Sequence, residues 1–414
     1  MSGSVEIDAG RLWSRLMELG EIGAIPGGGV DRQALSDGEH LAWARVIGWA
    51  EAAGMEAATD AAANLLLTLP GGDRGLAPVL AGSHLDSQPT GGRFDGAFGV
   101  MAALEVAASL AGSPLPRARD FTVVVWMNEE GSRFAPGMMG SAVFAGQRDL
   151  AGVRAARDGE GKTAGEEIDR LHRAFPGLPL RPPFRPWACI EPHIEQGPQL
   201  EREGAVIGVV SGIDGKVTCE VTLTGQRDHA GTQPMADRRD AVMAFARVAL
   251  QLQQEIGLAD PETRFTIGRV EVSPNAPSVI ADEVRFRIDL RHPDGAVLHQ
   301  LAARIAPLAA EVALPCAASV QVLVDAPPNG FDPALRQAIA ASAVRRGLPA
   351  LEMASAAGHD ARHLAPRCPT AMIFIPCRGG ISHDPAEWAE PAHVAAGAQV
   401  LADVVAPLLA EEEA

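Results

Sequence analysis

The sequence predicts an α/β protein with two domains: a larger one built on a mostly parallel sheet, and an inserted ferredoxin-like (βαββαβ) domain. Three observations support this. Short apolar runs alternate with helical stretches through the first 150 residues, which is typical of a parallel sheet covered by helices. A β-α-β-β-α-β order follows from about residue 213. The first pattern then returns after residue 328. A length of 414 residues suits about two or three domains.

The first domain opens with an amphipathic helix that carries Leu12, Leu16 and Leu19 on one face. A later helix is expected at 96–111, with Asp95 at its N-cap position. The proline-rich segment 177–187 is expected to be irregular. Apolar runs without helical spacing predict strands at 63–70, 77–84 and 121–128.

The inserted domain is assigned to residues 213–327, and the first domain to 1–212 and 328–414. In 283–292 apolar and charged residues alternate strictly, which predicts a sheet covered on one face only. Hinges are expected near 211–215 and 326–330, where glycines and a Pro-Pro pair occur. The strands of the inserted domain are expected at 216–225, 263–272, 283–292 and 318–325, and its helices at 235–257 and 295–311. A strand at 370–376 and a helix at 391–410 complete the first domain.

Composition excludes some classes of partner. The chain has 35 Lys and Arg against 52 Asp and Glu, a net charge of −17, and it lacks a run of basic residues, so nucleic-acid binding is not expected. No stretch approaches the ~20 apolar residues of a membrane span, so no membrane partner is expected. Five cysteines lie far apart without a CxxC pair, which is typical of reduced thiols in a cytoplasmic protein.

Candidate functional residues follow a predicted strand in the segment 82–96. His84 lies at the carboxyl end of that strand, where open α/β sheets bind ligands. Asp86 could accept a hydrogen bond from the other ring nitrogen of His84, as outer carboxylates do behind metal-bound imidazoles. Asp95 lies in a glycine-rich loop. The structural alternative is an ordinary hydrogen-bonded histidine and an N-cap aspartate.

Two adjacent carboxylates, Glu129 and Glu130, follow the strand 121–128. Such a pair at a strand end is costly unless a cation offsets the repulsion. Because successive residues point in different directions, one is expected to bind a metal and the other to transfer protons. A solvated acidic turn is the alternative.

Two further histidines lie beside predicted strand ends. His193 occurs in EPHIEQGP and His383 in the glycine-flanked segment GGISHDP. Together with the three donors above, they form the mixed nitrogen and oxygen ligand set that two divalent ions about 3.5–4 Å apart require, with one carboxylate bridging. The five expected metal ligands are His84, Asp95, Glu130, His193 and His383.

Six motifs in this order resemble those of the M20-type dinuclear metallohydrolases, specifically the hydantoinase/carbamoylase-family amidases. This branch includes N-carbamoyl-L-amino acid hydrolases, β-ureidopropionases and allantoate amidohydrolases. The resemblance covers nearly the whole chain. Its motifs are GSHLDSQPTGGRFDG, NEEGSRF, EPHIEQGP, DHAGTQPM, AAGHDA and GGISHDP.

The resemblance implies a role for each matching residue. His84, Asp95 and His193 would bind one metal, and Asp95, Glu130 and His383 the other, so that Asp95 bridges. Glu129 matches the general base and Asp86 the carboxylate that orients His84. The inserted domain would act as a lid and a homodimer interface, with His229 reaching a neighbouring subunit's site. Positions that hold the substrate or its oxyanion are matched by Gln196, His229, Arg291 and His359.

The implied reaction is hydrolysis of an N-carbamoyl-L-amino acid to the amino acid, ammonia and carbon dioxide. Glu129 would take a proton from a water shared by the two metals and return it to the leaving nitrogen. His229 would stabilise the oxyanion, and Arg291 would bind the substrate carboxylate. Zinc or manganese are expected, with cobalt or nickel as alternatives.

One position departs from the family pattern and leaves the substrate open. Ser278 stands where the carbamoylases carry an asparagine, and a hydroxyl cannot supply both an amide donor and a carbonyl acceptor. Asn275 is a nearby substitute. The alternatives are β-ureidopropionate, allantoate or another ureido acid, then N-acyl amino acids or dipeptides. An inactive homologue that acts as a binding protein is the remaining alternative.

Overall fold

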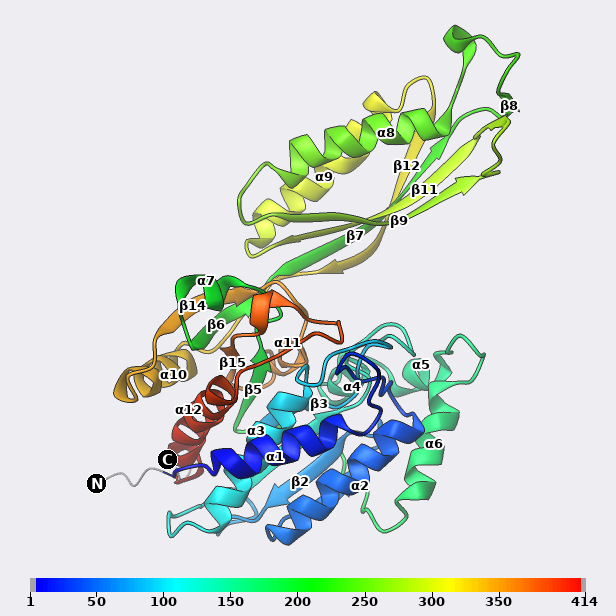
Figure 1. Ribbon diagram of the computed structural model, residues 1–414. Coiled ribbons are helices and arrows are strands. Elements are labelled where there is room, and N and C mark those ends of the chain that lie inside the picture. The colour runs from blue at the N-terminus through cyan, green and yellow to red at the C-terminus, as the bar shows by residue number, and fades with distance from the viewer. Residues whose placement is uncertain (1–4, 411–414) are drawn as a thin grey trace. The chain divides into compact units, whose positions relative to one another are not determined.

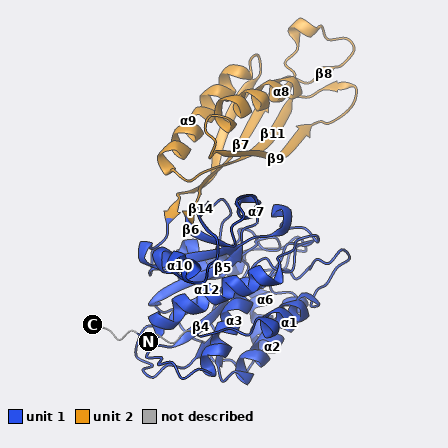
Figure 2. Ribbon diagram, turned by 60° about the vertical axis from the view of Figure 1, so that its left-hand side comes forward, with its two compact units in different colours: residues 1–211, 330–414 blue, residues 212–329 orange. Residues whose placement is uncertain are grey.

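The computed structural model describes residues 5–410; the ends of the predicted first domain, 1–4 and 411–414, lie outside the described residues. The chain divides into two compact units (Figure 2). Unit 1 contains residues up to Ser211 and from Gly330 onward, and unit 2 is Gly212–Asn329. Both boundaries fall within the two segments expected to connect the domains. Movement at these segments stays a prediction.

Unit 1 is built on a nine-stranded sheet in the order β1-β2-β4-β3-β5-β15-β6-β13, with β14 paired to β6. The four central strands are parallel, and β2 and β6 join them antiparallel. This confirms the predicted α/β class, with a parallel centre to the sheet. The strands are β1 (Glu56–Thr59), β2 (Leu65–Leu69), β3 (Val79–His84), β4 (Phe121–Trp126), β5 (Ala188–Ile194), β6 (Ile207–Ile213), β13 (Asn329–Gly330), β14 (Ala350–Ser355) and β15 (Thr370–Ile375).

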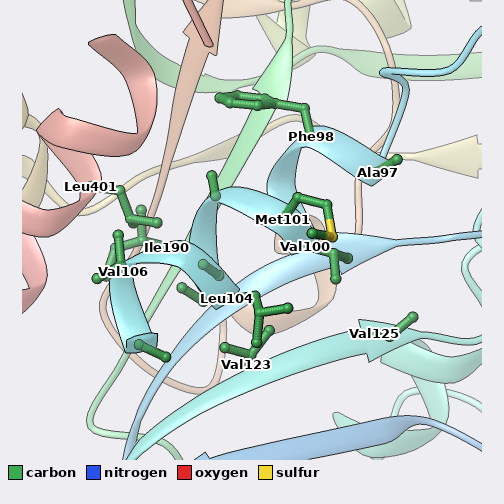
Figure 3. Close-up of a cluster of buried hydrophobic side chains, with 14 of the residues drawn as sticks. Ala97, Phe98, Val100, Met101, Leu104, Val106, Val123, Val125, Ile190 and Leu401 are labelled. Atoms are coloured by element: carbon green, nitrogen blue, oxygen red, sulfur yellow. The ribbon is translucent and has the colours of Figure 1, made fainter. Parts of the chain in front are cut away.

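Both faces of this sheet are buried, because each central strand is apolar at consecutive positions. Val123 and Val125 of β4 face the larger core, while Val124 and Trp126 face a smaller cluster on the other side. Figure 3 shows the larger core around α3 (Ala97–Ala111), whose Leu104 lies near Val123. At Gly82 of β3 an added Cβ would lie 2.0 Å from the Val124 carbonyl oxygen, so only glycine fits there.

Helices cover the two faces of the sheet (Figure 1). The helices α1, α3, α10 and α12 belong to the larger core, and α4 and α11 pack on the other face. Among the described residues, five helices of unit 1 begin after a side chain that accepts a main-chain hydrogen bond, such as Ser36 before α2 and Thr163 before α6. Apart from α3, the helices of unit 1 are α1 (Ala9–Gly20), α2 (Asp37–Ala52), α4 (Met139–Phe144), α5 (Leu150–Ala155), α6 (Ala164–Ala174), α7 (Gln199–Glu203), α10 (Pro333–Arg345), α11 (Ala361–Leu364) and α12 (Pro391–Ala410).

Unit 2 has the predicted βαββαβ order. Its antiparallel sheet runs β12-β7-β11-β9, and two helices cover one face. In β11 the apolar residues Val284, Phe286, Ile288 and Leu290 are buried against the helices, as the alternation predicts. The elements are β7 (Gly215–Thr224), α8 (Ala241–Leu252), β9 (Arg264–Ser273), β11 (Glu283–His292), α9 (Gly295–Val312) and β12 (Ala317–Ala326), with a short β8–β10 pair (Asp228–His229 and Val279–Ile280).

Three local expectations are wrong. Asp95 is not the N-cap of α3; Gly96 occupies that position, and Asp95 turns its carboxylate towards histidines instead. The helix expected at 235–257 begins only at Ala241, because the Asp240 carboxylate caps it there. The strand that carries His193 is longer than the apolar run before it, and it contains that histidine.

The helix α12 corrects the expectation that no stretch approaches a membrane span. Pro391–Ala410 is long and apolar enough by length and composition. In the structure 56% of its most apolar 18-residue stretch is buried, and the helix packs against α3 and β15. It is a core helix of unit 1.

All five cysteines are free, as their spacing predicts, and all five are buried in the structure.

Candidate active site

The carboxyl ends of the four central parallel strands of unit 1 supply one cluster of polar side chains. His84 ends β3, and Glu129 and Glu130 follow β4. His193 lies near the end of β5, and the segment after β15 leads to His383. The register between β3 and β5 pairs Val79 with Ala188, which sets His84 level with His193 five residues later. The two imidazole centroids are 5.8 Å apart.

The first donor group surrounds Asp95 on one side. Its Oδ1 lies 3.6 Å from His84 Nε2 and 3.2 Å from His193 Nε2. All three side chains are buried. One ligand atom from each lies within 4.8 Å of the others, a spacing that one metal ion can span.

The second donor group uses the other oxygen of the same carboxylate. Asp95 Oδ2 lies 3.2 Å from His383 Nε2, which is 3.4 Å from Glu130 Oε2. One ligand atom from each of Asp95, Glu130 and His383 lies within 4.8 Å of the other two. Because Asp95 belongs to both groups, the arrangement has the shared carboxylate that a dinuclear site requires.

Main-chain contacts fix which nitrogen each buried imidazole presents. His84 Nδ1 donates to the main-chain oxygen of Asp86 at 2.9 Å, and His193 Nδ1 donates to that of Ile194 at 2.9 Å. Each imidazole therefore presents Nε2 towards Asp95, and Nε2 is the nitrogen that is left to bind a metal ion.

The hydrogen-bond partners of the Asp86 carboxylate differ from those expected. Its carboxylate Oδ1 is 3.6 Å from His84 Nδ1, beyond hydrogen-bond distance, so the hydrogen bond of His84 goes to the main chain of Asp86. The carboxylate instead accepts from the main-chain N–H groups of Glu129 and Glu130, each at 3.2 Å. Asp86 thus holds the acidic turn beside His84.

A glycine is required where α3 begins. Gly96 has φ of 62°, and an added Cβ would lie 2.4 Å from the His84 ring. Its N–H also lies 3.2 Å from His193 Nε2. A side chain at this position would displace His84, so the glycine-rich loop belongs to the site.

Glu129 lies beside the first donor group. Its Oε2 is 3.6 Å from His84 Nε2, and its side chain is 10% exposed. Burial raises the pKa of Glu129 well above its ordinary value, against the opposing effect of His84; Asp360, Glu130 and Asp86 raise it further. A carboxyl with a raised pKa can accept a proton near neutral pH and give it back.

The site carries more buried negative charge than its own cations balance. Burial and the neighbouring Asp95 raise the pKa of Glu130 to about 7. The hydrogen bond with Asp95 raises the pKa of His383 to about 9, with Glu130 adding to it. Asp95 itself is buried, which raises its pKa, but hydrogen bonds to His193, His383 and His84 hold it well below its ordinary value. Carboxylates and imidazoles crowded in this way fit divalent cations.

The two other predicted site residues of unit 1 lie next to these donors. Gln196 Nε2 donates to Asp95 Oδ2 at 2.8 Å and lies 3.4 Å from His383 Nε2. His359 is buried under His193, with ring centroids 4.5 Å apart, and its Nε2 is 3.0 Å from Ser355 Oγ. Burial and the neighbouring His193 hold the pKa of His359 well below its ordinary value, so it is neutral.

The remaining predicted site residues belong to unit 2, where they occupy opposite ends of the sheet. His229 pairs with Val279, and the Ala230 N–H donates to the Ser278 oxygen, beyond the start of β11. Asn275 lies in the same loop, with φ of 55°. Arg291 lies near the other end of β11, and its guanidinium pairs with Asp289 at 2.8 Å. The eight steps along β11 from Glu283 to Arg291 span about 26 Å.

Several polar residues around the donors received no role from the sequence. Gln88 Nε2 donates to Glu130 Oε2 at 2.7 Å, and Ser382 Oγ lies 3.2 Å from Asp95 Oδ2. Glu191 accepts from Ser83 Oγ and from the Ala361 N–H. All of them could have been singled out because they lie inside the motifs. Only the tertiary structure shows which groups Gln88, Glu191 and Ser382 contact.

If Asp95 is shared, its loss should affect both ions. After reconstitution with Mn²⁺ or Zn²⁺, elemental analysis should find about two ions per wild-type chain, about one in His383→Ala and fewer than one in Asp95→Asn. His299→Ala in unit 2 is the control, since its imidazole pairs with exposed Asp325. Wild-type metal content in Asp95→Asn would contradict the shared carboxylate.

Comparison with known proteins agrees with this geometry. Residues 80–406 match the family model "Peptidase family M20/M25/M40". An N-carbamoyl-L-amino-acid amidohydrolase of Rhizobium meliloti is 39% identical over 398 residues, 95% of each chain. An allantoate amidohydrolase of Escherichia coli K12 is 36% identical over 392 residues, 93% of this chain and 94% of the relative.

Solved structures agree as well. The crystal structure of an amidase of the hydantoinase/carbamoylase family from Burkholderia multivorans has a TM-score of 0.91 and 42% identity, covering 98% of this chain and 99% of that one. The M20 family is generally metal-dependent, which suits the two donor groups around Asp95. The chain therefore belongs to the M20/M25/M40 peptidase family, as a hydrolase of amide C–N bonds of the carbamoylase and allantoate amidohydrolase type.

Proposed function

We propose that this chain hydrolyses the carbamoyl C–N bond of an N-carbamoyl-L-amino acid. The observation that carries the proposal is the pair of donor groups that share Asp95, with Glu129 within 3.6 Å of His84 Nε2. The R. meliloti relative, which is named for this activity and matches 95% of the chain, supports the substrate class.

His84, Asp95 and His193 hold one divalent ion in this proposal, and Asp95, Glu130 and His383 hold the other. Two such ions, when bound, acidify a water molecule and polarise the carbonyl oxygen of the substrate. Zinc or manganese suit the mixed histidine and carboxylate donors, and cobalt or nickel are the alternatives. Gln88 and Gln196 hold Glu130 and Asp95 through their amide groups.

Glu129 moves the proton. It takes one from the attacking water as the new C–O bond forms at the carbamoyl carbon, and it returns one to the amino nitrogen as the C–N bond breaks. The products are the free amino acid and carbamic acid, which decomposes to ammonia and carbon dioxide. The raised pKa of Glu129, caused first by its burial, supports this exchange near neutral pH.

Unit 2 supplies the groups that bind the substrate. His229 Nδ1 accepts from the N–H groups of Gly231 and Thr232, so its proton is on Nε2, where it can donate to an oxyanion. The guanidinium of Arg291 can bind the substrate carboxylate while its Nε also donates to Asp289. Asn275 and Ser278 lie in the loop beside His229 and are assigned to the ureido end, and His359 supports His193 from beneath.

The separation of His229 from Arg291 supports a homodimer. An N-carbamoyl amino acid is about 7 Å long, whereas the stretch of β11 between the two ends of the sheet, from Glu283 to Arg291, alone spans about 26 Å. One copy of unit 2 therefore cannot offer both to the same substrate. In the proposed dimer, built through unit 2, each site receives His229 from the neighbouring chain. Arg291 comes from the same chain as the metal ligands. Unit 2 then acts as lid and interface.

Other ureido acids remain the second candidate. The 36% identical allantoate amidohydrolase covers nearly the same length of chain, so β-ureidopropionate and allantoate are tested beside the N-carbamoyl amino acids. N-acyl amino acids and dipeptides form a third group.

If Glu129 is the general base, replacing it should lower turnover and leave metal binding unchanged. Glu129→Gln should keep its metal content and thermal stability and lower kcat by about 10²- to 10⁴-fold, because the amide cannot accept a proton. Glu203→Gln, exposed on α7, is the matched control. Substantial activity in Glu129→Gln would show that another group is the base.

The substrate proposal predicts which product appears. With Mn²⁺ or Zn²⁺ added, N-carbamoyl-L-amino acids should release ammonia together with the free amino acid, and kcat/KM should exceed the values for β-ureidopropionate, allantoate and N-acetyl amino acids. Ammonia and amine are measured separately. Release of amine from N-acetyl substrates at higher kcat/KM would replace the ureido assignment.

The dimer proposal predicts complementation. His229→Ala and Glu129→Gln are each inactive, but a co-refolded equal mixture should recover about a quarter of wild-type activity, because half of the re-paired dimers are mixed and each mixed dimer holds one intact site. If His229 served its own chain's site, no mixed dimer would be intact and the mixture would stay inactive.

A further inference from the structure

Glu387 is a buried carboxylate that the reaction above does not use. It is 2% exposed, and it follows His383 by four residues. Its Oε1 accepts from the main-chain N–H groups of Phe94 at 2.9 Å and Asp95 at 3.1 Å. Within the described residues no lysine or arginine pairs with it. Burying such a group costs free energy that only these polar contacts offset.

The second oxygen of Glu387 reaches the other side of the site. Oε2 lies 2.8 Å from Ser382 Oγ, and that hydroxyl lies 3.2 Å from Asp95 Oδ2. Glu387 therefore connects the main chain at the shared ligand with the residue before His383. The contacts close a ring through Glu387, Ser382 and Asp95.

The loop before Asp95 is shaped to receive this carboxylate. A Cβ added to Gly92 would lie 2.0 Å from both the Cδ and the Oε1 of Glu387. Any larger residue at position 92 would push the carboxylate away from the N–H groups that it holds.

The same two loops are also joined by apolar contacts. Trp388, next to Glu387, packs edge-on against Phe94 at 5.5 Å and against Trp13 at 5.6 Å between ring centroids. Aromatic packing of this kind already holds the loops together. A buried carboxylate is thus not needed merely to keep the loops in contact, which points to its hydrogen bonds at Asp95 as its role.

We propose that Glu387 is a positioning residue for the metal centre: it sets the angle at which Asp95 presents its two oxygens to the two ions. The inference rests on the proposed dinuclear hydrolase and adds a residue to it. Glu387 touches neither substrate nor ion, and it acts through the main chain of Asp95 and the hydroxyl of Ser382. Residues that orient metal ligands in this way are worth about 10- to 100-fold in metal affinity.

The experiment measures metal affinity directly, on the full-length apoprotein titrated with Mn²⁺ alone against a chelating dye. Glu387→Ala should raise the dissociation constant of the more weakly bound ion about 10- to 100-fold. Glu387→Gln should restore most of the affinity, since its Oε1 still accepts from both N–H groups. Gly92→Ala should weaken binding although Glu387 keeps its carboxylate, because the added methyl group displaces that carboxylate from the two N–H groups. The double variant Gly92→Ala/Glu387→Ala should be no weaker than Glu387→Ala, because both act on one interaction.

Glu105→Ala is the matched control for a purely structural effect. Glu105 is another buried glutamate of unit 1, which accepts from the Asp8 N–H at 2.9 Å and pairs with Arg11, away from the donors. This variant should lose thermal stability but bind Mn²⁺ as the wild type does. As a second readout, the Co²⁺-loaded Glu387→Ala protein should show a d–d absorption spectrum altered in intensity, which Glu105→Ala should not.

Wild-type affinity and an unchanged Co²⁺ spectrum in Glu387→Ala would overturn the inference. If Glu387→Ala does not fold, the Mn²⁺ affinity of Gly92→Ala is the deciding measurement. Wild-type affinity in that variant would also overturn the inference. Failure of the proposed function is distinguishable, because then the wild-type chain itself would bind no pair of ions or release no ammonia.

Discussion

Asp95 brings one buried carboxylate close to three imidazoles, with His193 and His383 each 3.2 Å away and His84 at 3.6 Å. The rest of unit 1 serves this arrangement. Carboxylates in a buried site repel one another, and the protein offsets that repulsion with hydrogen bonds whose donors lie on rigid elements. Asp86 holds the acidic turn, and Glu387 holds Asp95 itself. In the proposed function, divalent cations would complete the balance of charge.

The parallel sheet makes this convergence possible. In parallel strands the carboxyl ends lie at one edge, so β3, β4, β5 and β15 deliver their last residues to a common place. Both faces of the sheet are buried, so the strand ends cannot shift without disturbing a close-packed core. Glycine at positions 82, 92 and 96 lets main chain and side chains approach more closely than any other residue allows.

The two units divide the work that the proposal requires. Unit 1 contains every expected metal ligand, the expected base and the two supporting residues Gln196 and His359. Unit 2 contains the expected contacts to the substrate, spread over the length of one sheet. The strand β11 alone spans about 26 Å from Glu283 to Arg291, so groups at its two ends are too far apart to contact one small substrate. This is a physical reason for a dimer that does not depend on how the two units sit relative to each other.

The sequence by itself determined the α/β class, the βαββαβ order of unit 2 and the segments that carry the donors, because period-2 and helical patterns and motif residues are local properties of a chain. It missed several helices and strands that have few large apolar residues, such as β1 and α10, and it misplaced Asp95 at a helix cap. Only the tertiary structure decided that the two oxygens of Asp95 face different histidines, that the Asp86 carboxylate binds main-chain N–H groups and that Glu387 reaches back to residue 95. Such contacts join residues up to 293 positions apart, and no local pattern encodes the orientation of a side chain towards so distant a partner.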